Sequence, residues 1–140
     1  CKSPEGVVER LNFLLKNRTR DTTFFDIGCG PGTVINALAQ EQPWRFVGVD
    51  ISPKKIEQAE FRSTELEISD RTYFHTGDFL EFEKYIPDST DPLELLFYVY
   101  LVPRMINLPR FSQSALKLIS EGAQFVANST CFDVASRCSA

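Results

Sequence analysis

Acidic residues stand where predicted strands end, and the first of them precedes a glycine-rich loop. This loop is the segment DIGCGPG at residues 26–32, which follows a β-prone run and opens a helical pattern. Glycines in such a loop allow positive φ angles and let a ligand approach the main chain closely. Tight turns also collect glycine, so the loop alone indicates either a ligand site or an ordinary turn.

Two further carboxylates strengthen the case for a ligand site. Asp50 ends the second predicted strand, 18 residues after Gly32, where an acidic side chain can accept hydrogen bonds from ribose hydroxyls. Two such bonds would contribute roughly 1.5–3 kcal/mol. Asp78 ends the third predicted strand and could accept a hydrogen bond from an adenine amino group. The structural alternatives are that Asp50 caps the next helix and that Asp78 belongs to a Gly-Asp turn.

The loop also distinguishes between two nucleotide-like ligands. Dinucleotide loops favour the pattern G-x-G-x-x-G, in which a helix N-terminus faces a pyrophosphate. Here the pattern is G-x-G-x-G, and Thr33 occupies the position of the late glycine. Asp26 would repel a pyrophosphate but suits the ammonium group of a methionine moiety. The sequence therefore favours S-adenosylmethionine over a nicotinamide cofactor.

Alternating strands and helices are expected to position these residues. Strands are predicted at residues 22–27, 45–49, 72–75, 93–100 and 123–127. Helices are predicted from Ser3 and Pro4, after the glycine loop, from 52 to about 66, at 79–85, and from Pro103 to Gly122 with a break or kink at Pro109. This alternation implies parallel pairing, with ligands beyond the carboxyl ends of the strands. The expected fold class is α/β and Rossmann-like: a mostly parallel, twisted sheet with helices on both faces.

Length and composition limit the other possibilities. The 140 residues are interpreted as a single domain, residues 1–140, and the apolar stretch 93–102 is too short to span a bilayer. A net charge of −4 with scattered basic residues argues against a nucleic-acid partner. The cysteines lack C-x-x-C spacing and the chain has one histidine, so no metal site is predicted. Free thiols suggest a reducing intracellular compartment, cytoplasmic or mitochondrial.

Three segments together resemble class I S-adenosylmethionine-dependent methyltransferases: FFDIGCGPGTVINALA, FVGVDISPKKIEQAE and HTGDF. The resemblance covers nearly the whole chain and implies an enzyme that uses S-adenosylmethionine as its cofactor. It implies that Asp26, Gly28 and Gly30 line the methionine portion, that Asp50 binds the ribose, that Ile51 packs on adenine, and that Asp78 and the Phe79 backbone read the adenine edge. Such domains usually close their sheet with a strand hairpin. Since only residues 128–140 follow the fifth strand, the chain is expected to be truncated before that hairpin.

A narrower similarity concerns the methyl acceptor. The segments SPEGVVERLNFL and YVYLVPRMINL are similar to protein-lysine methyltransferases of the mitochondrial ATP synthase c-subunit type. The glycine loop departs from that branch, which commonly has Gly-x-Gly-Asp-Gly-Arg. No Asn-Pro-Pro-Tyr motif follows the fourth strand, which argues against amide or nucleobase amino groups as acceptors. The expected function is methylation of a protein lysine. The alternatives are a methyltransferase acting on a small molecule or RNA, and a noncatalytic cofactor-binding or scaffold module.

No single general base is predicted, because methyl transfer chiefly requires that the acceptor be positioned and water excluded. Tyr98 and Tyr100 fall on one face of the fourth strand and are candidates for lining a substrate channel; packed aromatic residues are the alternative. His75 is interpreted as a lining or structural residue, and Cys29 as a small filler residue rather than a nucleophile.

Overall fold

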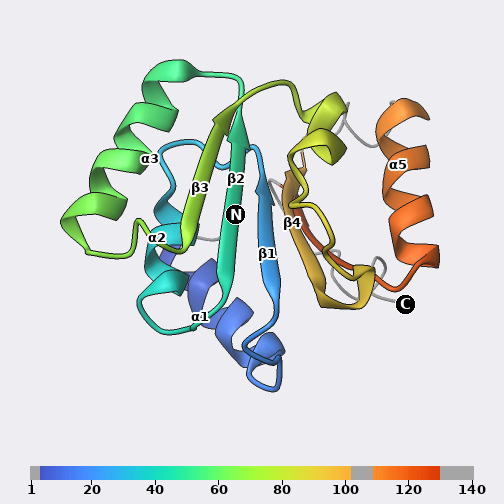
Figure 1. Ribbon diagram of the computed structural model, residues 1–140, viewed down its shortest axis with the longest axis horizontal. Helices are drawn as coiled ribbons and strands as arrows, with labels where there is room; N and C mark the ends of the chain where they lie inside the picture. The colour runs from blue at the N-terminus through green and yellow to red at the C-terminus, as the bar shows by residue number, and fades with distance from the viewer. Residues whose placement is uncertain (1–3, 102–108, 130–140) are drawn as a thin grey trace.

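The computed structural model describes residues 4–101 and 109–129 of the 140-residue chain (Figure 1). The strands are β1 (Thr23–Ile27), β2 (Arg45–Asp50), β3 (Thr72–Thr76), β4 (Leu95–Leu101) and β5 (Gln124–Ser129). The helices are α1 (Pro4–Leu15), α2 (Thr33–Ala39), α3 (Pro53–Glu65) and α5 (Pro109–Ser120), with 3-10 turns η1 (Phe79–Tyr85) and η2 (Pro92–Glu94). Among these, no helix is long and apolar enough to cross a bilayer.

All five strands are parallel and lie in the order β3-β2-β1-β4-β5. Helices α1, α2 and α3 cover one face of the sheet, and η1 and α5 cover the other (Figure 1). The α/β, Rossmann-like fold predicted from the sequence is therefore confirmed. Because every strand runs the same way, the ends of β1, β2 and β3 meet at one edge, where the glycine loop leaves β1.

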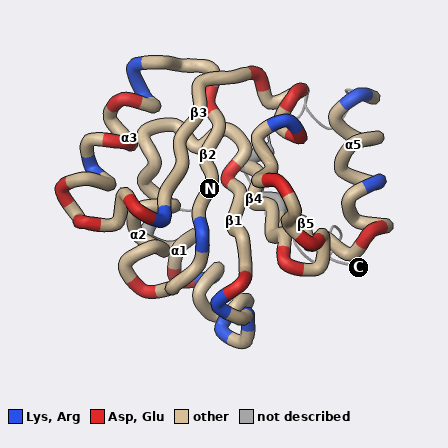
Figure 2. Tube along the Cα trace, viewed as in Figure 1, with Lys and Arg blue, Asp and Glu red and all other residues tan. Residues whose placement is uncertain are grey.

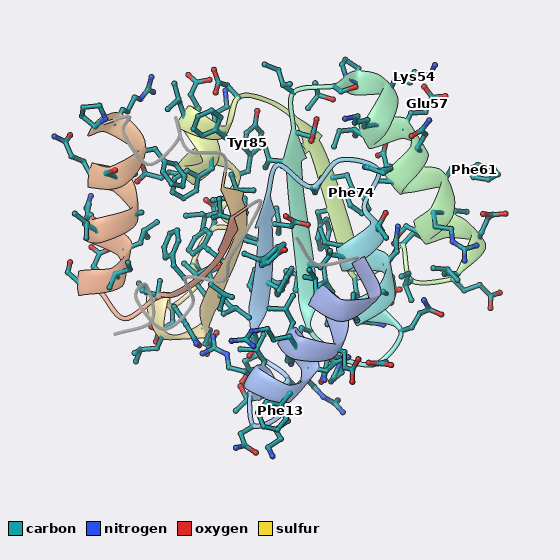
Figure 3. The ribbon with its side chains drawn as sticks, turned by 180° about the vertical axis from the view of Figure 1, so that it is seen from behind. Phe13, Lys54, Glu57, Phe61, Phe74 and Tyr85 are labelled. Atoms are coloured by element: carbon teal, nitrogen blue, oxygen red, sulfur yellow. The ribbon has the colours of Figure 1, made fainter. Side chains whose placement is uncertain are left out.

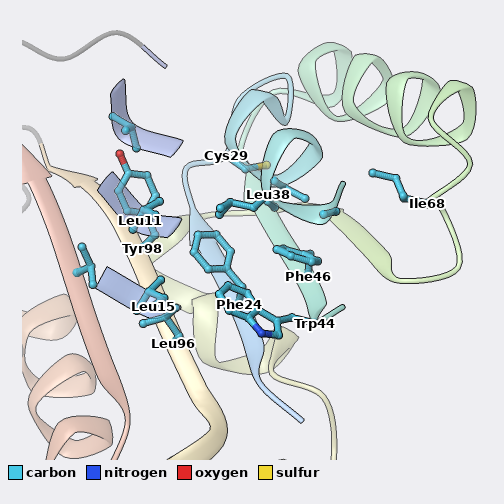
Figure 4. Close-up of a cluster of buried hydrophobic side chains, with 14 of the residues drawn as sticks. Leu11, Leu15, Phe24, Cys29, Leu38, Trp44, Phe46, Ile68, Leu96 and Tyr98 are labelled. Atoms are coloured by element: carbon cyan, nitrogen blue, oxygen red, sulfur yellow. The ribbon is translucent and has the colours of Figure 1, made fainter. Parts of the chain in front are cut away.

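Neighbouring phenylalanines divide the core into two layers. Successive side chains of a strand point to opposite faces, so Phe24 packs under the α1–α3 layer and Phe25 under the η1–α5 layer. Phe24 stacks with Trp44 at 6.4 Å between ring centroids (Figure 4). On the other face Phe97 stacks with Phe125 at 4.5 Å. Burying a large apolar side chain contributes roughly 1.5–3 kcal/mol, so this paired packing fixes the sheet between its two helix layers.

Side chains define where two of the helices begin and end. Ser52 is the N-cap of α3, and its Oγ accepts a hydrogen bond from the Lys55 amide at 3.3 Å. Beyond the C-terminus of α2, the Arg71 guanidinium donates to carbonyls that the helix and its exit loop leave unpaired. The acceptors are the oxygens of Ala39, Gln42 and Trp44, at 2.7, 2.9 and 3.1 Å. Arg71 thus joins the start of β3 to the segment that leads into β2.

The predicted start of the fourth strand is wrong by two residues. The strand was expected from residue 93, but β4 begins at Leu95. Asp91 caps η2 by accepting a hydrogen bond from the Leu93 amide at 2.9 Å, and Pro92 takes the first position of the turn. Leu93 is consequently 67% exposed. The capping chemistry of Asp91-Pro92 therefore outweighs the apolar character of Leu93.

The predicted helix from Pro103 to Gly122 is confirmed only in its second half. Helix α5 begins at Pro109, so this proline starts a helix where no amide hydrogen is needed, and residues 102–108 lie outside the described part of the chain. Phe111 and Leu118 form its buried face, and Gly122 follows the helix with a φ of 113°.

Candidate functional site

The glycine loop wraps over the end of β2 and is held there by backbone hydrogen bonds. The amides of Gly28 and Cys29 both donate to the Val49 carbonyl, at 2.8 and 3.0 Å. Gly28 and Gly30 have φ angles of 79° and 56°, in the left-handed region that other residues rarely adopt. Gly32 has a φ of 77°, so the loop conformation depends on all three glycines.

Open space lies above the first two glycines but not the third. A Cβ atom added to Gly28 or Gly30 would meet no atom within 4 Å. A Cβ added to Gly32 would lie 2.8 Å from the Cβ of Ala59 on α3. The first two glycines therefore leave a cradle for a ligand, whereas the third allows α2 and α3 to pack closely.

Asp50 lies at the end of β2 and anchors both the glycine loop and the start of α3. Its Oδ2 accepts a hydrogen bond from the Gly30 amide at 2.8 Å, and its Oδ1 accepts one from the Ser52 amide at 3.0 Å. Asp50 therefore does help to hold the start of the next helix, as the structural alternative to ribose binding predicted. Each carboxylate oxygen can accept a second hydrogen bond, so the side chain keeps acceptor capacity for a ligand hydroxyl.

Asp26 lies at the end of β1 and is a buried acid, only 3% exposed. Burial, and secondarily the nearby charge of Asp50, raise its pKa from 3.8 to about 8. No hydrogen bond from a described residue offsets this rise. A cationic group placed beside Asp26 would favour the charged carboxylate, so the site suits an ammonium group.

Asp78 follows β3 and caps η1. Its Oδ1 accepts a hydrogen bond from the Leu80 amide at 2.9 Å, and among the described residues its Oδ2 has no hydrogen-bond donor. The preceding Gly77 donates its amide to the Asp50 carbonyl at 2.9 Å, which ties the end of β3 to the end of β2. The turn therefore brings a carboxylate oxygen to the same edge of the sheet as Asp26 and Asp50.

Ile51 and Phe79 follow Asp50 and Asp78 and differ in their surroundings. Ile51 is 73% exposed, an unusual state for a large apolar side chain next to a polar cluster. Phe79 is half-buried, and its ring packs edge-on against Phe111 of α5 at 5.6 Å. The side chain of Ile51 is thus free to cover an aromatic ring, while that of Phe79 is held by the core and leaves its backbone for recognition.

Tyr85 is a residue of this region that the sequence did not single out. Its hydroxyl donates to the Thr76 carbonyl at 3.3 Å, and a Cβ on Gly77 would lie 2.3 Å from this hydroxyl oxygen. Gly77 does not have a positive φ, so its backbone conformation does not call for glycine, and the feature that favours glycine here is the close approach of the Tyr85 side chain. In the sequence, the one signal for this contact is that residue 77 is a glycine.

Of the two tyrosines expected near the acceptor, Tyr98 is a core residue. It is 4% exposed and stacks with Phe24 at 6.3 Å under the α1 layer (Figure 4). Tyr98 therefore matches the packed alternative and does not line an open channel. The side chain of Tyr100 lies outside the described part of the structure.

The side chains of His75 and Cys29 are held by packing. The His75 ring stacks on Tyr85 at 4.8 Å, and burial lowers its pKa. Cys29 is a buried free thiol, and burial together with Asp26 and Asp50 raises its pKa far above the ordinary range. A thiol with this pKa is a poor nucleophile, in agreement with a filler role. Among the described residues, no cluster of His, Cys, Asp or Glu is suited to hold a metal ion.

Comparison with known proteins agrees with this geometry. Residues 18–138 match the family described as methyltransferase domain. An RNA methyltransferase from Salinibacter ruber, solved with S-adenosyl-L-homocysteine, is similar with a TM-score of 0.66 and 23% identity; the match covers 91% of this chain and 76% of that one. A methyltransferase from Geobacter sulfurreducens, also solved with S-adenosyl-L-homocysteine, has a TM-score of 0.65 and 21% identity over 89% and 47% of the two chains.

A third similar structure is geranyl diphosphate C-methyltransferase from Streptomyces coelicolor A3(2), in complex with Mg²⁺, geranyl diphosphate and S-adenosyl-L-homocysteine. Its TM-score is 0.67 at 19% identity, and the match covers 89% of this chain and 45% of that one. This chain thus spans about half the length of two of the three structures. Since the family matches 121 of the 140 residues, the chain belongs to the methyltransferase domain family and is an S-adenosylmethionine-dependent domain of the Rossmann-like class.

Proposed function

We propose that this protein transfers a methyl group from S-adenosylmethionine to a lysine side chain of a protein substrate. The observation that carries the cofactor part is the meeting of Asp26, Asp50 and Asp78 around an open glycine cradle. The lysine part rests on the similarity of the N-terminal segment and of the segment that follows Tyr98 to protein-lysine methyltransferases.

Each part of the cofactor has a chemically suited group in this arrangement. Asp26 would pair with the ammonium group, and the backbone at Gly28 and Gly30 would lie against the methionine chain. Asp50 would accept hydrogen bonds from the ribose while it still holds the Gly30 amide. Ile51 would cover one face of the adenine, and the free Oδ2 of Asp78 would accept from its amino group.

When bound, S-adenosylmethionine supplies an electrophilic methyl group on its sulfonium. The remaining requirements fall on the protein, which must place a neutral amine in line with that methyl group and exclude water. A lysine ammonium must lose a proton before it attacks, and burial of the side chain lowers its pKa. Tyr100, at the carboxyl end of β4, remains the candidate for lining this part of the site.

Calorimetric titration with S-adenosylmethionine, S-adenosylhomocysteine and NADH tests the cofactor assignment. We expect micromolar binding of the two adenosyl ligands and none of NADH. Asp50→Ala should weaken this binding at least tenfold, whereas Asp70→Ala, which removes an exposed carboxylate from a loop outside the site, should leave it unchanged. A folded chain that binds no adenosyl ligand would contradict the assignment.

Transfer of a labelled methyl group to proteins of a cell lysate, followed by hydrolysis and separation of methylated amino acids, tests the acceptor. We expect labelled methyllysine, and no label with the Asp50→Ala variant. Label in RNA or in small molecules only would refute the lysine acceptor but keep the methyltransferase activity. Cofactor binding without transfer to any of these fractions would favour a noncatalytic binding module.

A further inference from the structure

Apart from the cofactor cradle, the chain has a hollow on the η1 side of the sheet. Its volume is about 420 Å³, within the range of small-molecule sites. Strands β2 and β3 supply its sheet side with Arg45, Val47, Tyr73 and His75. Tyr85 and the segment 86–88 that follows η1 supply the opposite side. Asp26, Asp50 and Asp78 do not line it, so it is distinct from the cofactor site.

Three aromatic side chains line this hollow: Tyr73, His75 and Tyr85. His75 and Tyr85 are already stacked, with 4.8 Å between their centroids and 22° between their planes. Tyr73 is 45% exposed, and its hydroxyl is fixed by a hydrogen bond to the Asp70 carbonyl at 3.3 Å. The Tyr73 ring is therefore held in place with much of its surface open to a ligand, at little cost in side-chain entropy.

A second, polar hollow of about 330 Å³ adjoins the first and shares Arg45 and Asp88 with it. Its other lining residues include Thr22, Thr23, Ser89 and Thr90. The charges of the two hollows balance, because three basic and three acidic side chains line them: Arg20, Arg45, Lys84, Asp21, Asp88 and Glu94. Lys84 is paired with Glu81 at 3.3 Å, whereas Arg45 forms no ion pair with any described residue.

We propose that these two hollows together bind a nucleoside, with its base in the aromatic hollow and its ribose in the polar one. A planar base would stack on Tyr73 beside the His75–Tyr85 pair, and aromatic stacking of this kind accepts any base. Arg45 and Asp88 line both hollows, so their charged groups would meet the ribose hydroxyls there. This inference is independent of the proposed methyl acceptor.

Charge favours an uncharged nucleoside over a nucleotide or a nucleic acid. The balanced charges of the two hollows offer no net attraction to a phosphate. In the part of the chain that the structure describes, lysine and arginine residues are scattered and form no continuous stripe that could follow a phosphate backbone (Figure 2). The net charge of −4 also disfavours the binding of a negatively charged phosphate group.

The single histidine of the chain makes a direct test possible, because its imidazole proton signals are unique. Burial lowers the pKa of His75, so the ring is neutral at pH 7.5 and its signals report stacking rather than protonation. Cytidine would be titrated into the full chain while saturating S-adenosylhomocysteine blocks the cofactor site. We expect saturable upfield shifts of the His75 signals at millimolar cytidine.

Three variants locate the binding. Tyr73→Ala should weaken cytidine binding about tenfold, as expected for loss of one stacking ring. Arg45→Gln, a change of an exposed side chain that should not impair folding, should also weaken it. The matched control is Phe61→Ala, which removes an exposed aromatic ring from α3, well away from Tyr85 (Figure 3), and should leave the affinity unchanged.

Several results would overturn the proposal. These are the absence of any His75 shift in a folded chain, equal cytidine affinity of all three variants, tighter binding of cytidine monophosphate than of cytidine, or equal shifts with maltose. Since the cofactor site is saturated throughout, any of these results would leave the proposed methyltransferase function untouched. Conversely, a chain without methyl transfer could still bind cytidine.

Discussion

The Gly30 amide, in the loop after β1, donates a hydrogen bond at 2.8 Å to Oδ2 of Asp50, the last residue of β2. The other oxygen of the same carboxylate accepts from Ser52, the N-cap of α3. One side chain thus fixes the glycine loop and the start of the next helix before any ligand arrives. A residue expected to bind the cofactor ribose also shapes the cradle that receives it.

Replacement of Asp50 should therefore affect both the free protein and cofactor binding. Asp50→Ala removes two amide acceptors, so we expect a loss of about 1–3 kcal/mol in the free energy of unfolding. S-adenosylhomocysteine affinity should fall at least tenfold. Asp50→Asn keeps one acceptor oxygen. Its free energy of unfolding and its S-adenosylhomocysteine affinity should therefore lie between those of Asp50→Ala and of the natural chain. Urea unfolding and calorimetry measure these effects, and equal stability of Asp50→Ala and the natural chain would contradict the anchoring role.

Asp26 should lower the stability of the free protein at high pH. Its pKa is raised from 3.8 to about 8, so between these values the folded chain holds a proton that the unfolded chain has lost. Stability should consequently fall as pH rises from about 4 to about 8. Asp26→Asn removes this dependence and should be more stable than the natural chain by about 2–4 kcal/mol at pH 8, with little difference at pH 4.

Thermal unfolding at the two pH values measures this effect, with the exposed Asp70→Asn as the matched control. The same Asp26→Asn variant should bind S-adenosylhomocysteine at least tenfold more weakly, because an amide cannot neutralise an ammonium group. A stabilised protein with unchanged affinity would show that Asp26 is not the ammonium partner.

Substitutions of Gly77 and Tyr85 should have non-additive effects on the free energy of unfolding. Gly77→Ala would place a methyl group 2.3 Å from the Tyr85 hydroxyl oxygen, so the turn before Asp78 or the tyrosine must move. We expect Gly77→Ala to lower the free energy of unfolding by about 1–3 kcal/mol. In the double variant with Tyr85→Ala, the total loss should be smaller than the sum of the two single losses. Additive losses in a double-mutant cycle would rule out the contact.

Arg71 should be important for stability although it lies far from the cofactor site. It donates hydrogen bonds to the carbonyls of Ala39, Gln42 and Trp44, which Arg71→Ala would leave without this donor. We expect a loss of about 1–3 kcal/mol, measured by urea unfolding. Arg62→Ala is the matched control: among the described residues, the Arg62 side chain forms only an exposed pair with Glu65 at 3.5 Å, so its loss should cost about 0.5 kcal/mol or less.

The order of the helices and strands, and the edge of the sheet at which the three aspartates lie, could be predicted from the sequence. Periodicity and capping residues such as Ser52-Pro53 depend on a few neighbouring positions, so helices and strands could be assigned locally. Because parallel strands end at one edge, Asp26, Asp50 and Asp78 could also be placed together before any coordinates.

The contacts that these residues make could not be predicted from the sequence. The bond from Gly30 to Asp50, the close approach of Tyr85 to Gly77 and the burial of Tyr98 beneath α1 each join residues that are distant along the chain. Such contacts depend on the twist of the sheet and on the packing of whole helices, which no local pattern encodes. The raised pKa of Asp26 has the same origin, since its cause is burial by all the elements around the end of β1.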